Sequence, residues 1–115
     1  MTTKQISDIE DFIHDNIYLA HLVRRISEKF QYSKSFIHSE FRRIKGVSIS
    51  DYILDKKMEM IREDMECGMP LYLALKELGF SQNSGTYYTE KYFEKYGESP
   101  QDTKRRAVNG GAKNG

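Results

Sequence analysis

The stretch QYSKSFIHSEFRRIKG, residues 31–46, has the pattern of an amphipathic helix that follows a tight turn. Ser33 can cap the start of this helix, and Gly46 can end it. Apolar residues recur at helical spacing and are expected to be buried: Phe36, Ile37, Phe41 and Ile44. Apart from Glu40, the remaining helix positions are basic or small and polar. The stretch therefore predicts a helix over residues 34–45 with one buried face and one cationic, solvent-exposed face.

This helix is the second half of a recurring unit. A helix is also expected over residues 20–30, separated from it only by Gln31-Tyr32-Ser33, and two short helices joined by a tight turn form a helix-turn-helix. The same order of helix, turn, helix and glycine recurs over residues 70–97. There the helices are expected at residues 71–78 and 85–96. A repeated helix-turn-helix is typical of proteins that read DNA.

The other segments complete an all-α chain. Helices are expected at residues 5–16 and 49–66 and from Pro100 onward, and strand-like alternation is lacking. We predict about seven helices, arranged as two helix-turn-helix subdomains joined by a long linker helix. The predicted boundaries are residues 1–47, the linker at 48–67, residues 68–108, and a disordered tail at 109–115.

Charge is unevenly distributed along the 115 residues, although the formal net charge is only +1. Residues 21–46 contain seven Lys and Arg residues and two acidic residues, a net charge of +5. Residues 100–115 contain four basic residues and one acidic residue, a net charge of +3. Because Lys and Arg neutralise phosphates, a cationic helical segment favours binding to nucleic acid.

Several other function classes are disfavoured. No apolar run approaches the roughly 20 residues that span a bilayer, and the N-terminal residues lack a signal-peptide pattern. Cys67 is the one cysteine, so an internal disulfide and a cysteine-based zinc site are not expected. The histidines at 14, 21 and 38 lack metal-ligand spacing, and no catalytic set is recognisable. We expect a cytoplasmic bacterial protein that is not an enzyme and has no cofactor, metal or membrane contact.

A series of landmarks points to a known family. In chain order they are Asp11 to Asn16, Tyr32-Ser33-Lys34, Phe41-Arg42-Arg43, Gly46, Lys56-Lys57-Met58, Gly79-Phe80, Tyr92 and Tyr96-Gly97-Glu98-Ser99-Pro100. With these landmarks the chain resembles the DNA-binding domain of AraC/XylS-type transcription regulators, especially the short stand-alone members, over about residues 5–106. The resemblance implies double-stranded DNA as the partner, RNA polymerase as a possible second partner, and activation of transcription. Two reading helices in one chain favour a monomer.

The chain departs from this family pattern at a few positions. Ser39 and Glu90 stand where the family usually has an arginine midway along each recognition helix. Gln31 replaces a turn glycine, and Arg62 replaces a small residue of the linker helix. These departures concern the affinity and sequence preference more than the fold.

The helix at residues 34–45 is the main candidate for insertion into the major groove. Its candidate DNA-binding residues are Lys34, Ser35, His38, Ser39, Arg42 and Arg43. Those of the second unit are Ser84, Thr86, Tyr87, Thr89, Glu90 and Lys91. Phosphate contacts are expected from Arg24, Arg25, Lys45, Lys104 and Arg105. Lysine and arginine in these places suit phosphates, whereas hydroxyl, imidazole and guanidinium groups at the groove can read base edges.

The second unit leaves an alternative open. Glu90 would be repelled by phosphates and is compatible with DNA only opposite a cytosine amino group. The aromatic residues Tyr88, Tyr92, Phe93 and Tyr96 are expected to anchor the core. The alternative hypothesis is a protein-interaction module that keeps the fold with little DNA binding, acting as a decoy or antagonist of polymerase or of another regulator.

Overall fold

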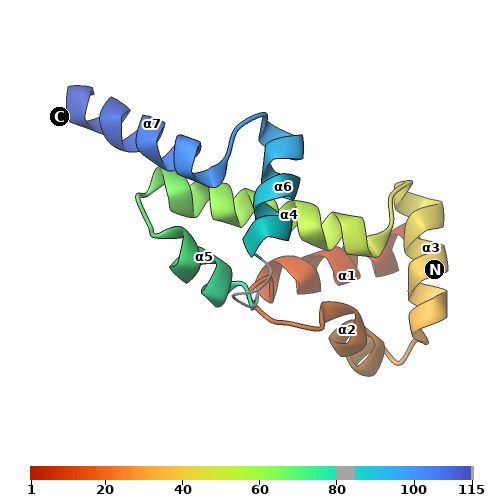
Figure 1. Ribbon diagram of the computed structural model, residues 1–115. Coiled ribbons are helices and arrows are strands. Elements are labelled where there is room, and N and C mark those ends of the chain that lie inside the picture. The colour runs from red at the N-terminus through yellow and green to blue at the C-terminus, as the bar shows by residue number, and fades with distance from the viewer. Residues whose placement is uncertain (80–84, 115) are drawn as a thin grey trace. The chain divides into compact units, whose positions relative to one another are not determined.

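The computed structural model describes residues 1–79 and 85–114, with the side chains of residues 1–79 and 85–109. These residues form seven α-helices and no strand (Figure 1). The helices are α1 (Thr3–Asp15), α2 (Leu22–Phe30), α3 (Lys34–Lys45), α4 (Ile49–Glu66), α5 (Leu71–Glu77), α6 (Gly85–Tyr96) and α7 (Pro100–Asn114). The predicted all-α fold with two helix-turn-helix units is confirmed.

The chain divides into two compact units, residues 1–56 and residues 57–115. The division falls inside α4, within the predicted linker of residues 48–67. Each half of the helix packs in its own unit. Tyr52 packs edge-on against Phe41 of the first unit, with ring centroids 5.2 Å apart. Lys57 donates a hydrogen bond to the Leu78 carbonyl of the second unit at 2.9 Å.

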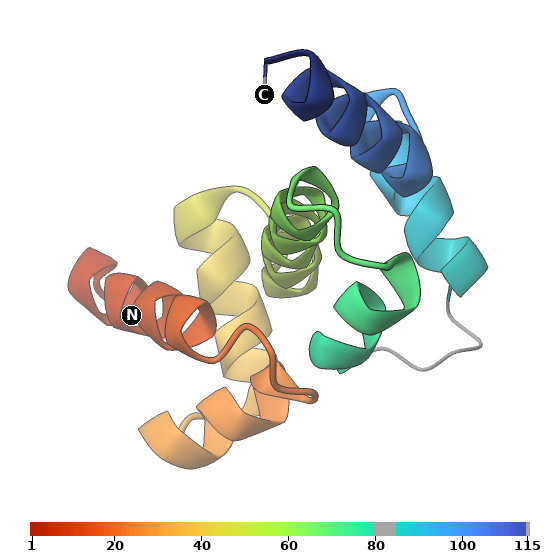
Figure 2. The same ribbon diagram turned by 90° about the vertical axis from the view of Figure 1, so that its left-hand side faces the viewer.

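In the first unit α1, α2 and α3 cluster together (Figure 2). The side chains that form its apolar core are fully or almost fully buried: Ile6, Ile9, Ile13, Ile17, Leu22, Ile26, Ile37, Phe41 and Ile49. Helix α1 begins two residues earlier than predicted because Thr2 and Gln5 form a capping box, which satisfies backbone N–H groups at the helix start. The spacing of Thr2 and Gln5 could have revealed this box.

The predicted ends of α3 are confirmed. The Ser33 hydroxyl accepts a hydrogen bond from the Phe36 N–H at 3.1 Å. At the other end Gly46 adopts a left-handed conformation with φ of 77°, and its N–H donates to the Arg42 carbonyl at 2.9 Å. Both ends of the helix are thus satisfied locally, which fixes where its exposed face begins and ends.

The turn between α2 and α3 is strained at one residue. Gln31 has a φ of 59°, in the left-handed region that favours glycine. The turn is held by the Ser27 hydroxyl, which donates to the Tyr32 carbonyl at 2.6 Å. Neighbouring hydrogen bonds therefore maintain a backbone conformation that the Gln31 side chain disfavours.

We expect Gln31→Gly to stabilise the protein by about 0.5–1 kcal/mol. Removing the Cβ relieves the left-handed strain. Glycine also raises the conformational entropy of the unfolded chain, which offsets part of this gain in stability. Urea unfolding followed by circular dichroism measures the change. Gln31→Ala is the matched control, since it removes the side-chain amide but keeps the Cβ. Equal stability of the alanine and glycine variants would contradict the strain interpretation.

The second unit is built around the C-terminal half of α4. Its buried apolar side chains are Met58, Ile61, Met65, Ala74, Leu75, Leu78 and Tyr92. The Lys57 ammonium is also buried and donates to the Leu78 carbonyl just past the end of α5, where carbonyls lack helical partners. Burial lowers the pKa of Lys57. The family landmark Phe80 and the candidate DNA-binding residue Ser84 lie outside the described residues.

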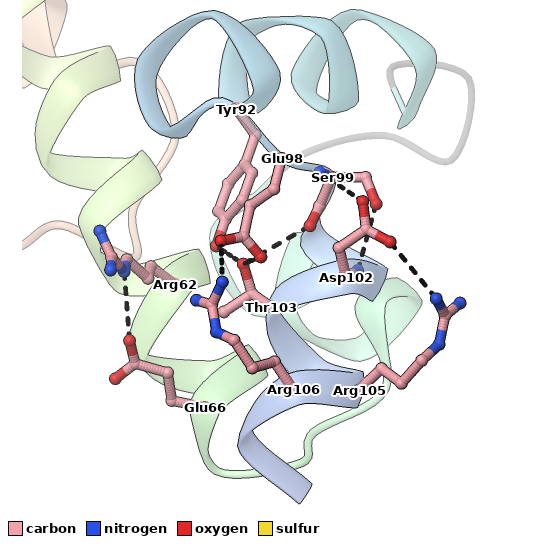
Figure 3. Close-up of polar contacts among 9 residues, drawn as sticks. All are labelled: Arg62, Glu66, Tyr92, Glu98, Ser99, Asp102, Thr103, Arg105 and Arg106. Carbon is pink, nitrogen blue, oxygen red and sulfur yellow. Dashed lines mark hydrogen bonds and ion pairs between the residues drawn. The ribbon is translucent and has the colours of Figure 1, made fainter. Parts of the chain in front are cut away.

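A polar cluster joins α6 to α7 (Figure 3). The Tyr92 hydroxyl lies 2.7 Å from the Thr103 hydroxyl, which in turn donates to Glu98 at 2.9 Å. Arg106 forms an ion pair with the same Glu98. Because the Tyr92 and Thr103 hydroxyls are buried and satisfied, the cluster fixes the start of α7 against α6.

Helix α7 continues further than predicted. The sequence suggested a disordered tail at residues 109–115, but α7 extends through Asn114. Ser99 and Asp102 form reciprocal side-chain to backbone hydrogen bonds of 3.1 and 3.2 Å at its start. This cap satisfies backbone groups of the first turn of α7. The helix also includes Gly110 and Gly111, although glycine is unfavourable in a helix interior.

Two of the aromatic residues predicted to be buried are exposed. Phe36 is 41% exposed and Phe93 is 57% exposed. Each is the direct neighbour of a fully buried residue, Ile37 and Tyr92 respectively. Adjacent residues on an α-helix point about 100° apart, so each phenylalanine is turned out of the core that its neighbour enters. The hydrophobic pattern includes both in the apolar face because they are apolar and lie next to buried positions.

Candidate nucleic-acid interface

The outward face of α3 combines cationic and short polar side chains. Ile37 and Phe41 anchor the inner face of the helix in the first unit. All six predicted α3 residues are exposed: Lys34, Ser35, His38, Ser39, Arg42 and Arg43. They therefore lie on the solvent side of the second helix of a helix-turn-helix, the element that enters the major groove in such motifs.

The cations of this face differ in their partners. Within the described part of the chain, the Lys34 ammonium and the Arg42 guanidinium have no hydrogen-bond or ion-pair partner. Arg43 donates two hydrogen bonds of 2.9 Å to Glu40 and a third, of 3.2 Å, to the Met1 carbonyl. Lys34 and Arg42 can thus receive phosphates without losing an internal partner, whereas Arg43 must exchange one.

Glu40 is the intramolecular anchor of Arg43. It also binds the Met1 ammonium, so the carboxylate links the start of the chain to the middle of α3. Hydrogen bonds from Arg43, followed by that from the Met1 ammonium, lower the pKa of Glu40 from 4.5 to about 2. This role of Glu40 was not predicted, although the three-residue spacing of Glu40 and Arg43 on a helix is the sequence signal that indicates the pair.

The Glu40 pair predicts an acid-dependent term in stability. Because the folded-state pKa is lowered, the stabilisation is present above about pH 4.5 and is lost as the pH falls toward 2. We expect Glu40→Gln to flatten the dependence of the unfolding midpoint on pH in this window, and Arg43→Gln to flatten it in part. Thermal unfolding followed by circular dichroism at a series of pH values measures it. An unchanged acid slope in Glu40→Gln would contradict the assignment.

The three phosphate candidates of the first unit, which lie on α2 and at the end of α3, also have internal partners. Arg24 lies 4.0 Å from Glu28, and Lys45 lies 3.4 Å from Glu10. Arg25 donates to the Ala20 carbonyl at 2.9 Å. Exposed ion pairs of this kind contribute little stability, so Arg24 and Lys45 can exchange their carboxylates for phosphates at small cost.

Helix α6 presents a different surface. Thr86, Tyr87 and Glu90 are exposed, and Thr89 and Lys91 are partly buried. Ser84, the remaining candidate of this unit, lies outside the described residues. The cations of α6 are matched by acids: Lys91 lies 3.4 Å from Glu94, and Lys95 lies 3.7 Å from Glu59. The α6 face therefore carries much less unpaired positive charge than the α3 face.

The cations of α7 are likewise mostly paired. Arg105 is exposed and lies 3.5 Å from Asp102, and Arg106 is bound to Glu98. Lys104 is partly buried. Arg105 and Arg106 thus pair with acidic residues at the start of α7, Asp102 and Glu98 respectively (Figure 3).

Sequence similarity to known proteins shows which family the chain belongs to. The chain is 31% identical over 91 residues to the multiple antibiotic resistance protein MarA of Escherichia coli (strain K12), over 77% of this chain and 72% of MarA. The chain belongs to the AraC/XylS family of DNA-binding transcription regulators. MarA of Salmonella typhimurium matches to the same extent. No family model matches the chain.

Two solved structures share this AraC/XylS fold. One is a probable AraC family transcriptional regulator from Rhodopseudomonas palustris, with a TM-score of 0.79 and 19% identity over 91% of this chain and 98% of that one. The other is the C-terminal domain of the two-component response regulator yesN from Fusobacterium nucleatum, with a TM-score of 0.77 and 20% identity over 89% and 99%. At these identities the likeness concerns the fold.

The structure explains how Arg62, one departure from the AraC/XylS pattern, is accommodated. It also shows where two others, Ser39 and Glu90, lie. The Arg62 guanidinium lies over the Tyr96 ring, 4.5 Å from its centroid, and pairs with Glu66 at 3.1 Å. A large side chain is tolerated there because it stacks on an aromatic face instead of entering the core. Ser39 and Glu90, which replace the usual arginines, are exposed on α3 and α6.

None of the described helices is both long and apolar enough to cross a membrane. Among the described residues, no group of three or more His, Cys, Asp or Glu side chains is placed to hold a metal ion.

Proposed function

We propose that this protein activates transcription by binding a specific duplex DNA sequence, with α3 as the principal reading helix in the major groove. The observation that carries the proposal is the exposed α3 face, on which Lys34 and Arg42 have no internal partner among the described residues. Partner-free cations on the second helix of a helix-turn-helix are suited to phosphates and to guanine edges.

The chemistry of α3 divides between positioning and reading. Lys34 and Ser35 lie in the first turn, the end that approaches the bases in helix-turn-helix proteins. Ser39 and His38 can exchange hydrogen bonds with base edges, and Arg42 can contact guanine or a phosphate. Arg24, Arg25 and Lys45 are proposed to contact phosphates, which set the register but carry no sequence information directly.

The second helix-turn-helix is proposed to make the weaker contact. Thr86, Tyr87 and Thr89 offer hydroxyl groups to the backbone or bases, while Glu90 restricts the site to positions that tolerate a carboxylate. Lys91, Lys104 and Arg105 supply the remaining positive charge. With both reading helices in one chain, we propose a monomer on an asymmetric site in the bacterial cytoplasm, with RNA polymerase as a further partner.

Fluorescence anisotropy with a labelled random duplex of about 25 base pairs tests the proposal. The slope of log affinity against log salt, divided by about 0.9, gives the number of phosphates neutralised. A count near three or four would indicate contact through the first unit alone, and six or more would indicate both. Absence of duplex binding even at low salt would refute the proposal.

The paired charges of α6 support a second candidate function. A face with Glu90 exposed and its lysines matched by carboxylates suits a protein partner better than phosphates. The protein would then act as a decoy or antagonist of polymerase or of another regulator. Tight binding to such a partner without duplex binding would favour this function, and a sequence-selective footprint would exclude it.

A further inference from the structure

Phe36 is an unexpected residue on the exposed side of α3. It occupies the first turn, and 41% of it is exposed. Its neighbours one turn further along the helix are Ser39, which is short, and Glu40, whose carboxylate is bound by Arg43 and the Met1 ammonium. Part of the ring is therefore open to solvent beside a short polar side chain.

Neighbouring residues hold the Phe36 ring in place. The Tyr32 ring lies beside it with centroids 5.4 Å apart, and the Tyr32 hydroxyl accepts a hydrogen bond from the Gln5 amide at 3.0 Å. The Phe36 N–H is fixed by the Ser33 cap. An apolar group that is already positioned loses little conformational entropy when it meets a ligand.

The chemistry of DNA limits what such a ring can contact. Phosphates are charged and hydrated, and base edges in the major groove are mostly hydrogen-bond donors and acceptors. The exception is the 5-methyl group of thymine, which apolar side chains recognise. A phenylalanine on the first turn of a groove-reading helix is therefore matched to thymine.

We infer that Phe36 is a specificity-determining residue that contacts a thymine 5-methyl group in the major groove. The inference rests on the proposed function, and it adds a base preference and the residue that sets it. Burying one methyl group corresponds to about a three- to five-fold gain in affinity.

Replacement of thymine by deoxyuridine removes only the methyl group, so it tests the contact directly. Sites are first selected with the full chain from a random duplex library, and each thymine of a selected site is then replaced singly. We expect one replacement to weaken binding about three- to five-fold in the unaltered protein. The same replacement should have no effect in Phe36→Ala or in Phe36→Gln, which retains most of the side-chain length.

Phe93→Ala is the matched control, because Phe93 is an exposed phenylalanine on α6. The Phe93 variant should keep the full deoxyuridine penalty at the position that Phe36 reads. Penalties that are the same in the unaltered protein and in both Phe36 variants, or absent at every thymine, would overturn the inference alone. Failure to select any site would overturn the proposed function and the inference together.

Discussion

Replacing Lys34 and Arg42 together by alanine is expected to weaken duplex binding by about 2–4 kcal/mol, or roughly 30- to 700-fold. Both side chains are exposed on α3, and neither has a polar partner in the described part of the chain. Their full charge is therefore available to DNA, and little internal interaction offsets the loss. Fluorescence anisotropy at several salt concentrations measures both the affinity and its salt dependence.

The salt dependence separates this effect from general destabilisation. Removing two phosphate-neutralising cations should lower the log–log salt slope by about two, and each single variant should lower it by about one. Lys4→Ala is the control, because Lys4 is an exposed lysine on α1 that is assigned no DNA contact. If the double variant and Lys4→Ala have the same slope, α3 is not the binding helix.

Arg43 illustrates why a list of basic residues predicts a binding face only in part. The sequence places Arg42 and Arg43 side by side on an exposed helix, and both are exposed as predicted. Yet Arg43 is bonded to Glu40 on the adjoining turn, whereas Arg42 is not. Sequence spacing limits which groups can pair on a helix, but the partner that an arginine takes also depends on what other elements bring nearby, here the Met1 carbonyl.

The fold was predictable from the sequence because local signals agree with one another. Ser33 and Gly46 mark the ends of α3 at the predicted residues. The predicted burial was wrong at Phe36 and Phe93, because each side chain points about 100° around the helix from its buried neighbour. The predictions also lacked any signal for the Lys57 contact with the Leu78 carbonyl, because these two residues lie far apart in the sequence.

The two phenylalanines of α3, Phe36 and Phe41, test whether the buried and exposed faces of this helix are assigned correctly. Phe41→Ala is expected to destabilise the first unit by about 3–5 kcal/mol, since Phe41 is fully buried and its ring packs against Tyr52. Total stabilities of small proteins are about 5–15 kcal/mol, so this loss should leave the unit marginal or unfolded. Urea unfolding followed by circular dichroism measures it, and Phe41→Leu should restore part of the stability.

Phe36→Ala is the matched control, as the same substitution on the same helix five residues earlier. Because Phe36 is partly exposed, we expect a loss below about 1 kcal/mol and a folded protein. The two variants should therefore lose DNA binding in different ways: Phe41→Ala because the reading helix is no longer held in place, and Phe36→Ala at a thymine while the fold persists. Equal loss of stability in both variants would mean that α3 is rotated about its axis. The residues assigned to its buried face and to its reading face would then be wrong.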